Sequence, residues 1–160
     1  MQIRVATDAD WPAIWPFFHE IVTARQTFAY DPELTFEQGQ ALWMTGRTTV
    51  AVDADGTVLG SANMYANRPG PGSHVASASF MVAPAARGRG VGRRLAEDMI
   101  AWAGQEGFRS IQFNAVVETN EPAVHLWQAL GFRIIGTVPE AFEHADHGYV
   151  GLHVMYRPLV

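Results

Sequence analysis

The chain has 160 residues, of which 48% are hydrophobic and 17% charged, a composition that predicts one globular domain over residues 1–160 and argues against extended disorder. Sixteen acidic residues against eleven basic ones give a net charge of −5, which argues against a nucleic-acid coat protein or a polybasic membrane binder. The chain has no cysteine and all eleven basic residues are arginine, so disulfides, thiolate metal ligands, cysteine nucleophiles and lysine Schiff bases are excluded.

The first part of the chain predicts a short strand followed by helices. The strand covers residues 3–6, and Thr7 can cap the helix that follows it. Apolar residues at three- and four-residue spacing over residues 11–22 form a stripe typical of a helix packed on a core. Pro16 lies inside this stripe, so the sequence leaves open whether it is one kinked helix or two. A second helix is predicted over residues 35–46.

A strand hairpin and a third strand come next. Residues 48–52 and 57–66 are rich in β-forming side chains, and the Asp-Ala-Asp-Gly turn at residues 53–56 is a strong hairpin signal. Two prolines and two glycines predict a loop over residues 67–73. Residues 74–82 then predict a strand.

The rest of the chain alternates helices and strands. The pattern predicts a helix at about 92–105, a strand at 110–117, a helix from Asn120 to Gly131, and strands at 133–138 and 149–156. A hairpin followed by strand–helix–strand–helix–strand is typical of a mixed α/β sheet.

The segment with the clearest chemistry is Arg-Gly-Arg-Gly-Val-Gly-Arg-Arg at residues 87–94, between a predicted buried strand and a predicted helix. Glycines let the backbone fold tightly, so that its N–H groups can converge on an anion, and the helix N-terminus adds a partial positive charge. Four of the eleven arginines lie in this one segment of an otherwise acidic chain. These features predict a small ligand that carries phosphates.

Three motif interpretations compete for this segment. The dinucleotide fingerprint fails because the sixth position counted from Gly88 is Arg93, and the nucleotide P-loop fails because there is no lysine. The pattern Arg-x-x-Gly-x-Gly fits Arg87, Gly90 and Gly92. The simpler alternative is a glycine-rich turn with solvated arginines.

A second motif follows at residues 120–132, Asn-Glu-Pro-Ala-Val-His-Leu-Trp-Gln-Ala-Leu-Gly-Phe. Together the two motifs resemble the signature motifs of the GNAT superfamily of acetyl-CoA-dependent N-acetyltransferases. The order of elements agrees with that superfamily over nearly the whole chain. The resemblance implies a central mixed, mostly antiparallel sheet of about seven strands, flanked by about four helices.

Residues 113–139 resemble one branch of the superfamily in particular. This branch contains the yeast azetidine-2-carboxylate acetyltransferase, and the phosphinothricin acetyltransferases are more distant relatives. Both act on small amino acids or their analogues. The resemblance therefore implies acetyl-CoA as cosubstrate, a small-molecule amine as acceptor, and no metal.

Carried onto this sequence, the resemblance also implies where coenzyme A binds. The pantetheine arm would pair with the strand residues Phe80, Met81 and Val82, and Asn120 would hydrogen-bond the arm from the other side. Asn120 has a second interpretation as a plain helix cap. The pyrophosphate would bind the backbone N–H groups of Arg87, Gly88, Arg89, Gly90, Val91, Gly92 and Arg93.

With no cysteine or lysine for a covalent relay, direct attack of the amine in a ternary complex is the favoured mechanism. A backbone N–H near Met81 or Val82 is the expected oxyanion donor. Many superfamily members carry a tyrosine in the last helix that protonates the departing thiolate. The matching position here is Trp127, whose indole donates a hydrogen bond but no proton, and core packing is its alternative role.

Many members also carry a glutamate on the strand before the glycine loop, and residues 74–80 contain none. The base could be His74, or a water held by Ser77 or Asn114, or an amine of low pKa could enter already neutral. Asn114 is interpreted either as a substrate-binding side chain or as a hydrogen-bonded bridge in the core.

Phe28 and Tyr30, between the first two helices, could form a wall of the substrate site or simply close the edge of the core. Residues 143–147, Glu-His-Ala-Asp-His, hold two histidines three apart, a spacing that can ligate zinc. They fall in a predicted hairpin loop without a second ligand cluster, so we expect a solvated loop. Exposed aromatic residues in the first helices and the terminal strands would allow a homodimer.

The alternative to an acetyltransferase is a catalytically silent acyl-CoA-binding or sensor module, which the missing tyrosine and glutamate would explain. RNA binding through the arginine–glycine segment is disfavoured by the net charge and by the lack of interleaved aromatic residues. Residues 1–8 lack the apolar run of a signal peptide, and no segment reaches the length of a membrane span. We therefore expect a cytoplasmic protein without membrane or nucleic-acid partners.

Overall fold

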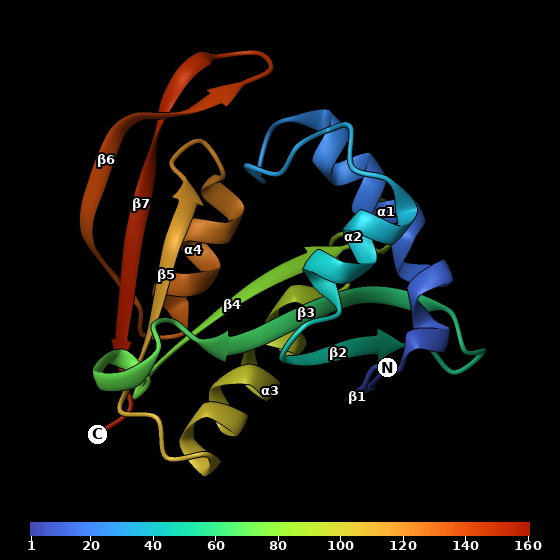
Figure 1. The fold of residues 1–160 in the computed structure, drawn as a ribbon, viewed down its shortest axis with the longest axis horizontal. Helices are drawn as coiled ribbons and strands as arrows, with labels where there is room; N and C mark the ends of the chain where they lie inside the picture. Colours follow the sequence, from blue (N-terminus) through green and yellow to red (C-terminus); the bar gives the residue numbers. More distant parts are fainter. The chain divides into compact units, whose positions relative to one another are not determined.

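The computed structural model describes all residues from 1 to 160 (Figure 1). Its α-helices are α1 (Trp11–Ala24), α2 (Phe36–Trp43), α3 (Val91–Gln105) and α4 (Glu121–Ala129). None of them combines the length and the apolar character needed to cross a membrane. Its strands are β1 (Gln2–Val5), β2 (Arg47–Val52), β3 (Val58–Ala66), β4 (Val75–Val82), β5 (Ser110–Val117), β6 (Arg133–His144) and β7 (Gly148–Pro158).

Hydrogen bonds join the seven strands in the order β1-β2-β3-β4-β5-β7-β6. The pairs β1–β2, β2–β3, β5–β7 and β6–β7 are antiparallel. In contrast, β4 and β5 pair in parallel, Val75 with Ser110 and Ala76 with Ile111. Parallel neighbours need a crossover connection, which α3 provides here. The mixed sheet with its four helices confirms the predicted fold class.

The chain divides into two compact units, each assembled from several parts of the sequence. Both α1 and β4 contribute residues to the two units. Unit 1 contains Met1–Glu20, Glu33–Tyr65 and Ala78–Trp102. Unit 2 contains Ile21–Pro32, Ala66–Ser77 and Ala103–Val160.

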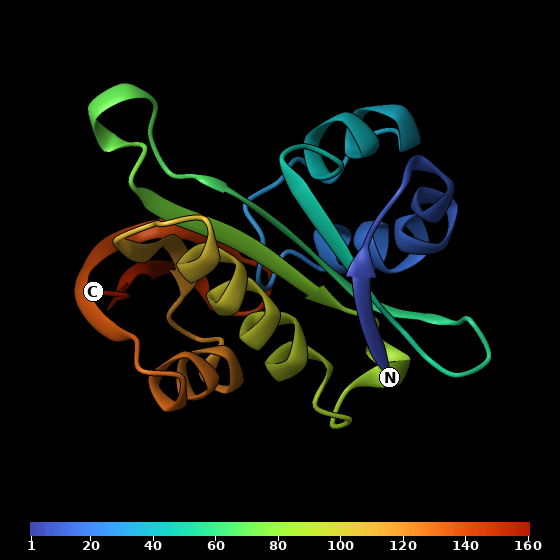
Figure 2. The ribbon, with the colours of Figure 1, turned by 90° about the horizontal axis from the view of Figure 1, so that it is seen from below.

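In unit 1, the strands β1, β2 and β3 have helices on both faces. Figure 2 shows α3 on one side of these strands and α1 with α2 on the other. Trp11 of α1 and Trp43 of α2 are completely buried, and the Trp11 ring lies edge-on to Phe18 with ring centres 5.3 Å apart. Across the sheet, Arg47 of β2 pairs with Asp98 of α3 at 2.9 Å. The predicted packing of the apolar stripe at residues 11–22 on a core is therefore confirmed for Trp11.

In unit 2, β5, β7 and β6 lie side by side and α4 packs on β5 (Figure 1). The contact is aromatic. The Phe113 ring on β5 stacks on Phe132 at 4.5 Å and meets Trp127 of α4 at 4.7 Å. Such aromatic clusters bury a large apolar area, so they fix α4 on the strand.

The first long helix is continuous, although the sequence leaves one or two helices open. Pro16 lies inside α1 and has no N–H to donate within the helix. The neighbouring side chains of Ile14, Phe17 and Phe18 are all buried. Burial of this apolar stripe outweighs the one missing hydrogen bond.

Strand β6 is longer than predicted, since it runs past residue 138 to His144. Pro139 and Glu140 argue against a strand in the sequence, and Glu140 has a φ of 52°. The pairing with β7 shifts its register after Val138, which is the signature of a β-bulge. The bulge absorbs both residues and lets the strand continue, so the predicted hairpin loop at residues 143–147 shrinks to a short tip.

Candidate functional site

The glycine–arginine segment at residues 87–94 connects β4 to α3 within unit 1. The chain that leads into it is held against β3, because Ala83 N–H donates to the Leu59 carbonyl at 2.8 Å. The adjacent Gly60 permits this close approach, since a Cβ there would lie 2.8 Å from the Met81 carbonyl oxygen. The segment therefore leaves the sheet from a fixed position.

The backbone amides of the segment are open to a ligand. The N–H groups from residue 88 to residue 93 find no acceptor in the protein. Gly88 and Gly90 both have a φ of 77°, a backbone conformation that residues with a Cβ adopt only with strain. The last three of these N–H groups form the first turn of α3, where no intrahelical acceptor exists and the helix dipole attracts anions.

The arginines of the segment differ in their pairing. Arg89 binds Asp53 at 2.8 Å, and Arg93 binds Glu97 one turn further along α3 at 3.5 Å. Arg87 has no acidic partner. The role of Asp53 was not predictable from the sequence, because an aspartate in a hairpin turn carries no signal of a distant partner.

This set of donors fits a diphosphate. Phosphate oxygens accept hydrogen bonds from free N–H groups at a helix N-terminus and from an unpaired guanidinium. The segment is also accessible, because a Cβ placed on Gly88 or Gly90 would meet no atom within 4 Å. The anion site that the sequence predicts here stays a prediction.

The three strand residues before the segment are buried to different degrees. The Met81 side chain is fully inside the core, whereas Phe80 and Val82 are half-buried. Their expected backbone pairing with a pantetheine arm stays a prediction.

Asn120 lies in unit 2 and caps α4, as the sequence predicts. Its Oδ1 accepts a hydrogen bond from the N–H of Ala123 at 3.4 Å, and Pro122 fits the first turn. Its Nδ2 group donates to no protein atom. The second predicted role of Asn120, a hydrogen bond to the cofactor arm, stays a prediction.

Asn114 lies on β5 of unit 2 in a chain of three amide side chains. Gln112 Nε2 donates to Asn114 Oδ1 at 2.9 Å, and Asn114 Nδ2 donates to Asn67 Oδ1 at 2.6 Å. Asn114 is exposed, so its interpretation as a bridge in the core is wrong. Gln112 and Asn67 were not predictable from the sequence as its partners, because neither residue stands in a motif.

Two more candidates belong to the same unit. His74 is exposed immediately before β4, and its carbonyl oxygen accepts from Arg109 N–H at 2.9 Å. Ser77 is only 2% exposed within β4. Of the three residues predicted to hold a proton or a water, His74 and Asn114 are therefore the exposed ones.

The segment with Phe28 and Tyr30, whose rings lie 5.4 Å apart, belongs to unit 2. Just before these two rings, the segment is hydrogen-bonded to the tip of the β6–β7 hairpin. Ala145 N–H donates to the Arg25 carbonyl at 3.0 Å, and the Gln26 amide donates to the Asp146 carboxylate at 3.1 Å. The expected wall of the substrate site thus rests on a second element.

The histidine pair at the hairpin tip has a structural role. His144 is buried, and its Nδ1 accepts hydrogen bonds from the N–H groups of Asp146 and His147 at 3.0 and 3.3 Å. Its ring stacks on that of His147 at 4.5 Å. The structure contains no group of three or more His, Cys, Asp or Glu side chains that could hold a metal ion.

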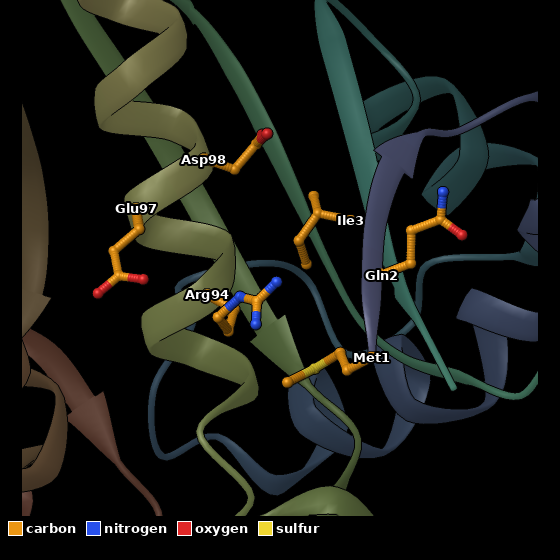
Figure 3. Close-up of a pocket in the computed structure, with 6 residues that line it drawn as sticks. All are labelled: Met1, Gln2, Ile3, Arg94, Glu97 and Asp98. Carbon is orange, nitrogen blue, oxygen red and sulfur yellow. The ribbon is translucent and has the colours of Figure 1, made fainter. Parts of the chain in front are cut away.

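A cavity of 410 Å³ lies between β1 and α3 in unit 1. Figure 3 shows Arg94 reaching from α3 toward the Met1 end of β1. No predicted site residue contributes to it. Its lining residues are Met1, Gln2, Ile3, Arg94, Glu97 and Asp98.

Comparison with known families identifies the chain. The profile of the acetyltransferase (GNAT) family matches residues 15–132. The chain belongs to this family. The resemblance drawn from the two sequence motifs is therefore confirmed.

Individual relatives of this GNAT protein are consistent with its assignment to the family. The solved structure of a GCN5-related N-acetyltransferase from Kribbella flavida is 77% identical, with a TM-score of 0.96 over 99% of this chain and 97% of that one. N-acetyltransferase aca1 of Schizosaccharomyces pombe is 35% identical over 107 residues, which are 66% of this chain but 51% of that protein. The chain thus spans about half the length of this relative.

Two further proteins are similar to this chain. The L-amino acid N-acyltransferase MnaT of Escherichia coli is 29% identical over 147 residues, which are 88% of this chain and 84% of that protein. A phosphinothricin acetyltransferase from Sinorhizobium meliloti, solved with acetyl-CoA, shares the fold at a TM-score of 0.88 and 24% identity, over 98% of this chain and 87% of that one.

Proposed function

We propose that this GNAT protein transfers the acetyl group of acetyl-CoA to the amine of a small amino acid or amino-acid analogue. The observation that carries the proposal is the row of free N–H groups at residues 88–93 beside the unpaired Arg87. The likeness to MnaT, an L-amino acid N-acyltransferase by name, supports the acceptor class.

The coenzyme is held mainly through its diphosphate. The free N–H groups of residues 88–93 donate to the phosphate oxygens, and Arg87 adds a charge-assisted hydrogen bond. Backbone groups of residues 80–82 pair with the pantetheine arm, and the Nδ2 group of Asn120 donates to it. Acetyl-CoA supplies, when bound, a thioester carbonyl that a neutral amine can attack.

The acceptor is held by exposed polar side chains of unit 2. The Asn114 amide is oriented by Gln112 and Asn67, so it offers one fixed N–H to the acceptor. Phe28 and Tyr30 line the acceptor site with aromatic surface. These side chains give specificity, because an amide kept in one orientation selects for a partner of matching polarity.

The reaction forms one N–C bond and breaks the C–S bond of the thioester, with direct attack in a ternary complex. A backbone N–H of Met81 or Val82 donates to the developing oxyanion. His74 accepts the proton that the amine loses, or the amine enters already neutral. The thiol of coenzyme A resembles that of cysteine, with a pKa of about 8.5, so it can leave largely as thiolate.

Three further properties complete the proposal. The enzyme works in the cytoplasm, both units belong to one catalytic domain, and two copies associate as a homodimer. The family profile supports the single domain, because it covers residues 15–132 and thereby draws on both units.

A thiol-release assay tests the reaction. Purified chain is mixed with acetyl-CoA and a panel of amino acids, their analogues and polyamines, and free thiol is followed spectrophotometrically. The chain has no cysteine, so it adds no thiol of its own. We expect at least one amino acid to release coenzyme A far faster than buffer, in amounts matching the acetylated product.

Two variants serve as a matched pair in this assay. Arg87→Ala removes the unpaired charge of residues 87–93, which we call the phosphate segment. It should raise KM for acetyl-CoA about tenfold, because charge-assisted hydrogen bonds contribute about 1.5–3 kcal/mol. Arg94→Ala removes the same charge from α3 outside residues 87–93 and should leave KM nearly unchanged. Saturable binding of acetyl-CoA with no turnover of any amine would instead establish the silent binding module.

A further inference from the structure

One side chain of the phosphate segment is bound to a distant part of unit 1. Arg89, between the two glycines of positive φ, donates from Nη2 to Asp53 Oδ2 at 2.8 Å. Asp53 opens the turn between β2 and β3. The contact therefore joins the phosphate segment to a hairpin that lies 36 residues earlier in the chain.

Asp53 is itself firmly placed. Its Oδ1 accepts a hydrogen bond from the N–H of Ala54 at 3.0 Å, and its own N–H donates to the Thr57 carbonyl at 2.9 Å. The Arg89 guanidinium, followed by the Ala54 N–H, lowers the pKa of the Asp53 carboxyl below its ordinary value. Asp53 is therefore an ionised anchor at neutral pH.

The phosphate segment has little else to fix it. Residues 87–90 are exposed, and the space beside Gly88 and Gly90 is empty. Glycine has the largest conformational freedom of any residue, so such a segment samples many arrangements unless a side chain restrains it. Arg89 is the side chain in residues 87–90 that makes a tertiary contact.

We propose that Asp53 is a positioning residue for the coenzyme diphosphate. It holds the Arg89 side chain on the hairpin and thereby orders the N–H groups of residues 88–93 before the coenzyme arrives. Arg87 remains the cation that meets the phosphates. The inference rests on the proposed function, in which this segment binds the diphosphate.

A positioning role for Asp53 and simple electrostatics predict opposite effects of its removal on coenzyme affinity. Asp53 is a negative charge near a site for a dianion, so its removal by charge alone would strengthen coenzyme binding. Removal of an anchor has the reverse effect, because the coenzyme must then order the segment itself. The sign of the change therefore separates the two effects.

The hairpin offers a matched control. Asp55 stands two residues from Asp53 in the same turn, and its Oδ1 accepts from the N–H of Thr57 at 3.0 Å without touching Arg89. Asp53→Asn keeps an oxygen for the Ala54 N–H but loses the ion pair. Asp55→Asn removes the same charge and keeps the anchor.

Calorimetric titration of the full chain with acetyl-CoA gives the first readout. We expect Asp53→Asn to weaken binding about two- to fivefold, the scale set by ordering a glycine-rich segment, while Asp55→Asn binds as tightly as the wild type or slightly tighter. In steady-state kinetics, KM for acetyl-CoA should rise by the same factor with kcat and KM for the amine unchanged. Backbone ¹⁵N relaxation should show residues 88–90 more mobile in ligand-free Asp53→Asn than in the wild type.

The exchanged pair Asp53→Arg with Arg89→Asp supplies a rescue. It rebuilds the contact with the charges reversed, so it should bind acetyl-CoA more tightly than either single variant. Equal or tighter binding by Asp53→Asn, or no rescue by the exchanged pair, overturns the inference while the proposed function stands. A wild-type chain that does not bind acetyl-CoA overturns the proposed function, and this inference with it.

Discussion

The indole of Trp127 could pack in the core or could act on the leaving thiolate, and these two roles require different properties of the side chain. Its ring is 6% exposed and lies 4.7 Å from Phe113 and 5.9 Å from Phe132, so it completes the aromatic cluster that joins α4 to β5. A proton donor at this position would need an acidic group that indole does not have. The packing contacts therefore account for Trp127 without a proton transfer.

Trp127→Phe separates packing from chemistry. Phenylalanine keeps an aromatic ring but removes the indole N–H and part of the buried volume. We expect a loss of unfolding free energy of about 1–3 kcal/mol, measured by urea denaturation, because a cavity remains beside Phe113. The pH profile of kcat should keep its shape. A large fall in kcat at unchanged stability would instead show that the indole N–H stabilises the leaving thiolate.

At the scale of elements, an ion pair between the exposed Arg4 and the buried Asp10 joins β1 to the turn just before α1. Arg4 on β1 donates two hydrogen bonds to the Asp10 carboxylate, at 2.9 and 2.7 Å, and Thr7 N–H donates a third at 2.8 Å. Asp10 is 8% exposed. The pKa of Asp10 lies below its ordinary value, chiefly because of the hydrogen bonds from Arg4.

This arrangement predicts a dependence of stability on pH. A carboxyl whose pKa is lower in the folded state stabilises the fold above its unfolded pKa of about 3.9, and the contribution disappears as the pH falls through the folded pKa. At pH 7, Asp10→Asn should be less stable than the wild type by about 1.5–3 kcal/mol, the range for hydrogen bonds to charged groups. The difference should shrink as the pH drops below about 4.

Urea titrations at several pH values measure this difference. Asp8→Asn is the matched control, because Asp8 is exposed at the start of the same turn and has no ion pair. It should differ little from the wild type at every pH. A stability gap for Asp10→Asn that stays constant from pH 7 to pH 3 would contradict the role given to the Arg4 pair.

The elements that the sequence predicts well are those whose ends carry a chemical signal. Strand β5 covers residues 110–117 as predicted, because Gly107 ends the preceding helix and Asn120 caps the next one. The continuation of β6 was not predictable, since Pro139 and Glu140 oppose a strand and are absorbed only by a bulge. The site shows the same limit. Its glycines and arginines form a readable motif, whereas the partners of Asn114 and Arg89 come from elsewhere in the chain.

At the scale of the whole molecule, four of the nine exposed large hydrophobic residues lie on the β6–β7 hairpin. Strand β6 is last in the hydrogen-bonding order, so one of its edges has no partner within the chain. Ile135 and Val138 on β6 are 52% and 51% exposed, and Tyr149 on β7 is 67% exposed. The aromatic residues of α1 that the sequence analysis offered as a second surface include Trp11 and Phe18, which are buried. We therefore expect the contact of the predicted homodimer to lie on the β6–β7 hairpin.

A second copy is the partner that suits such an edge, because two antiparallel copies of one strand form a self-complementary two-fold contact. Sedimentation equilibrium should give twice the chain mass of 17.6 kDa. Val138→Lys should shift the protein toward the monomer and weaken association at least about tenfold, since it puts two like charges at the contact, one from each copy. Val5→Lys is the control, because Val5 is an equally exposed valine on β1, at the other end of the strand order. A wild-type mass of 17.6 kDa at every concentration would rule out this dimer.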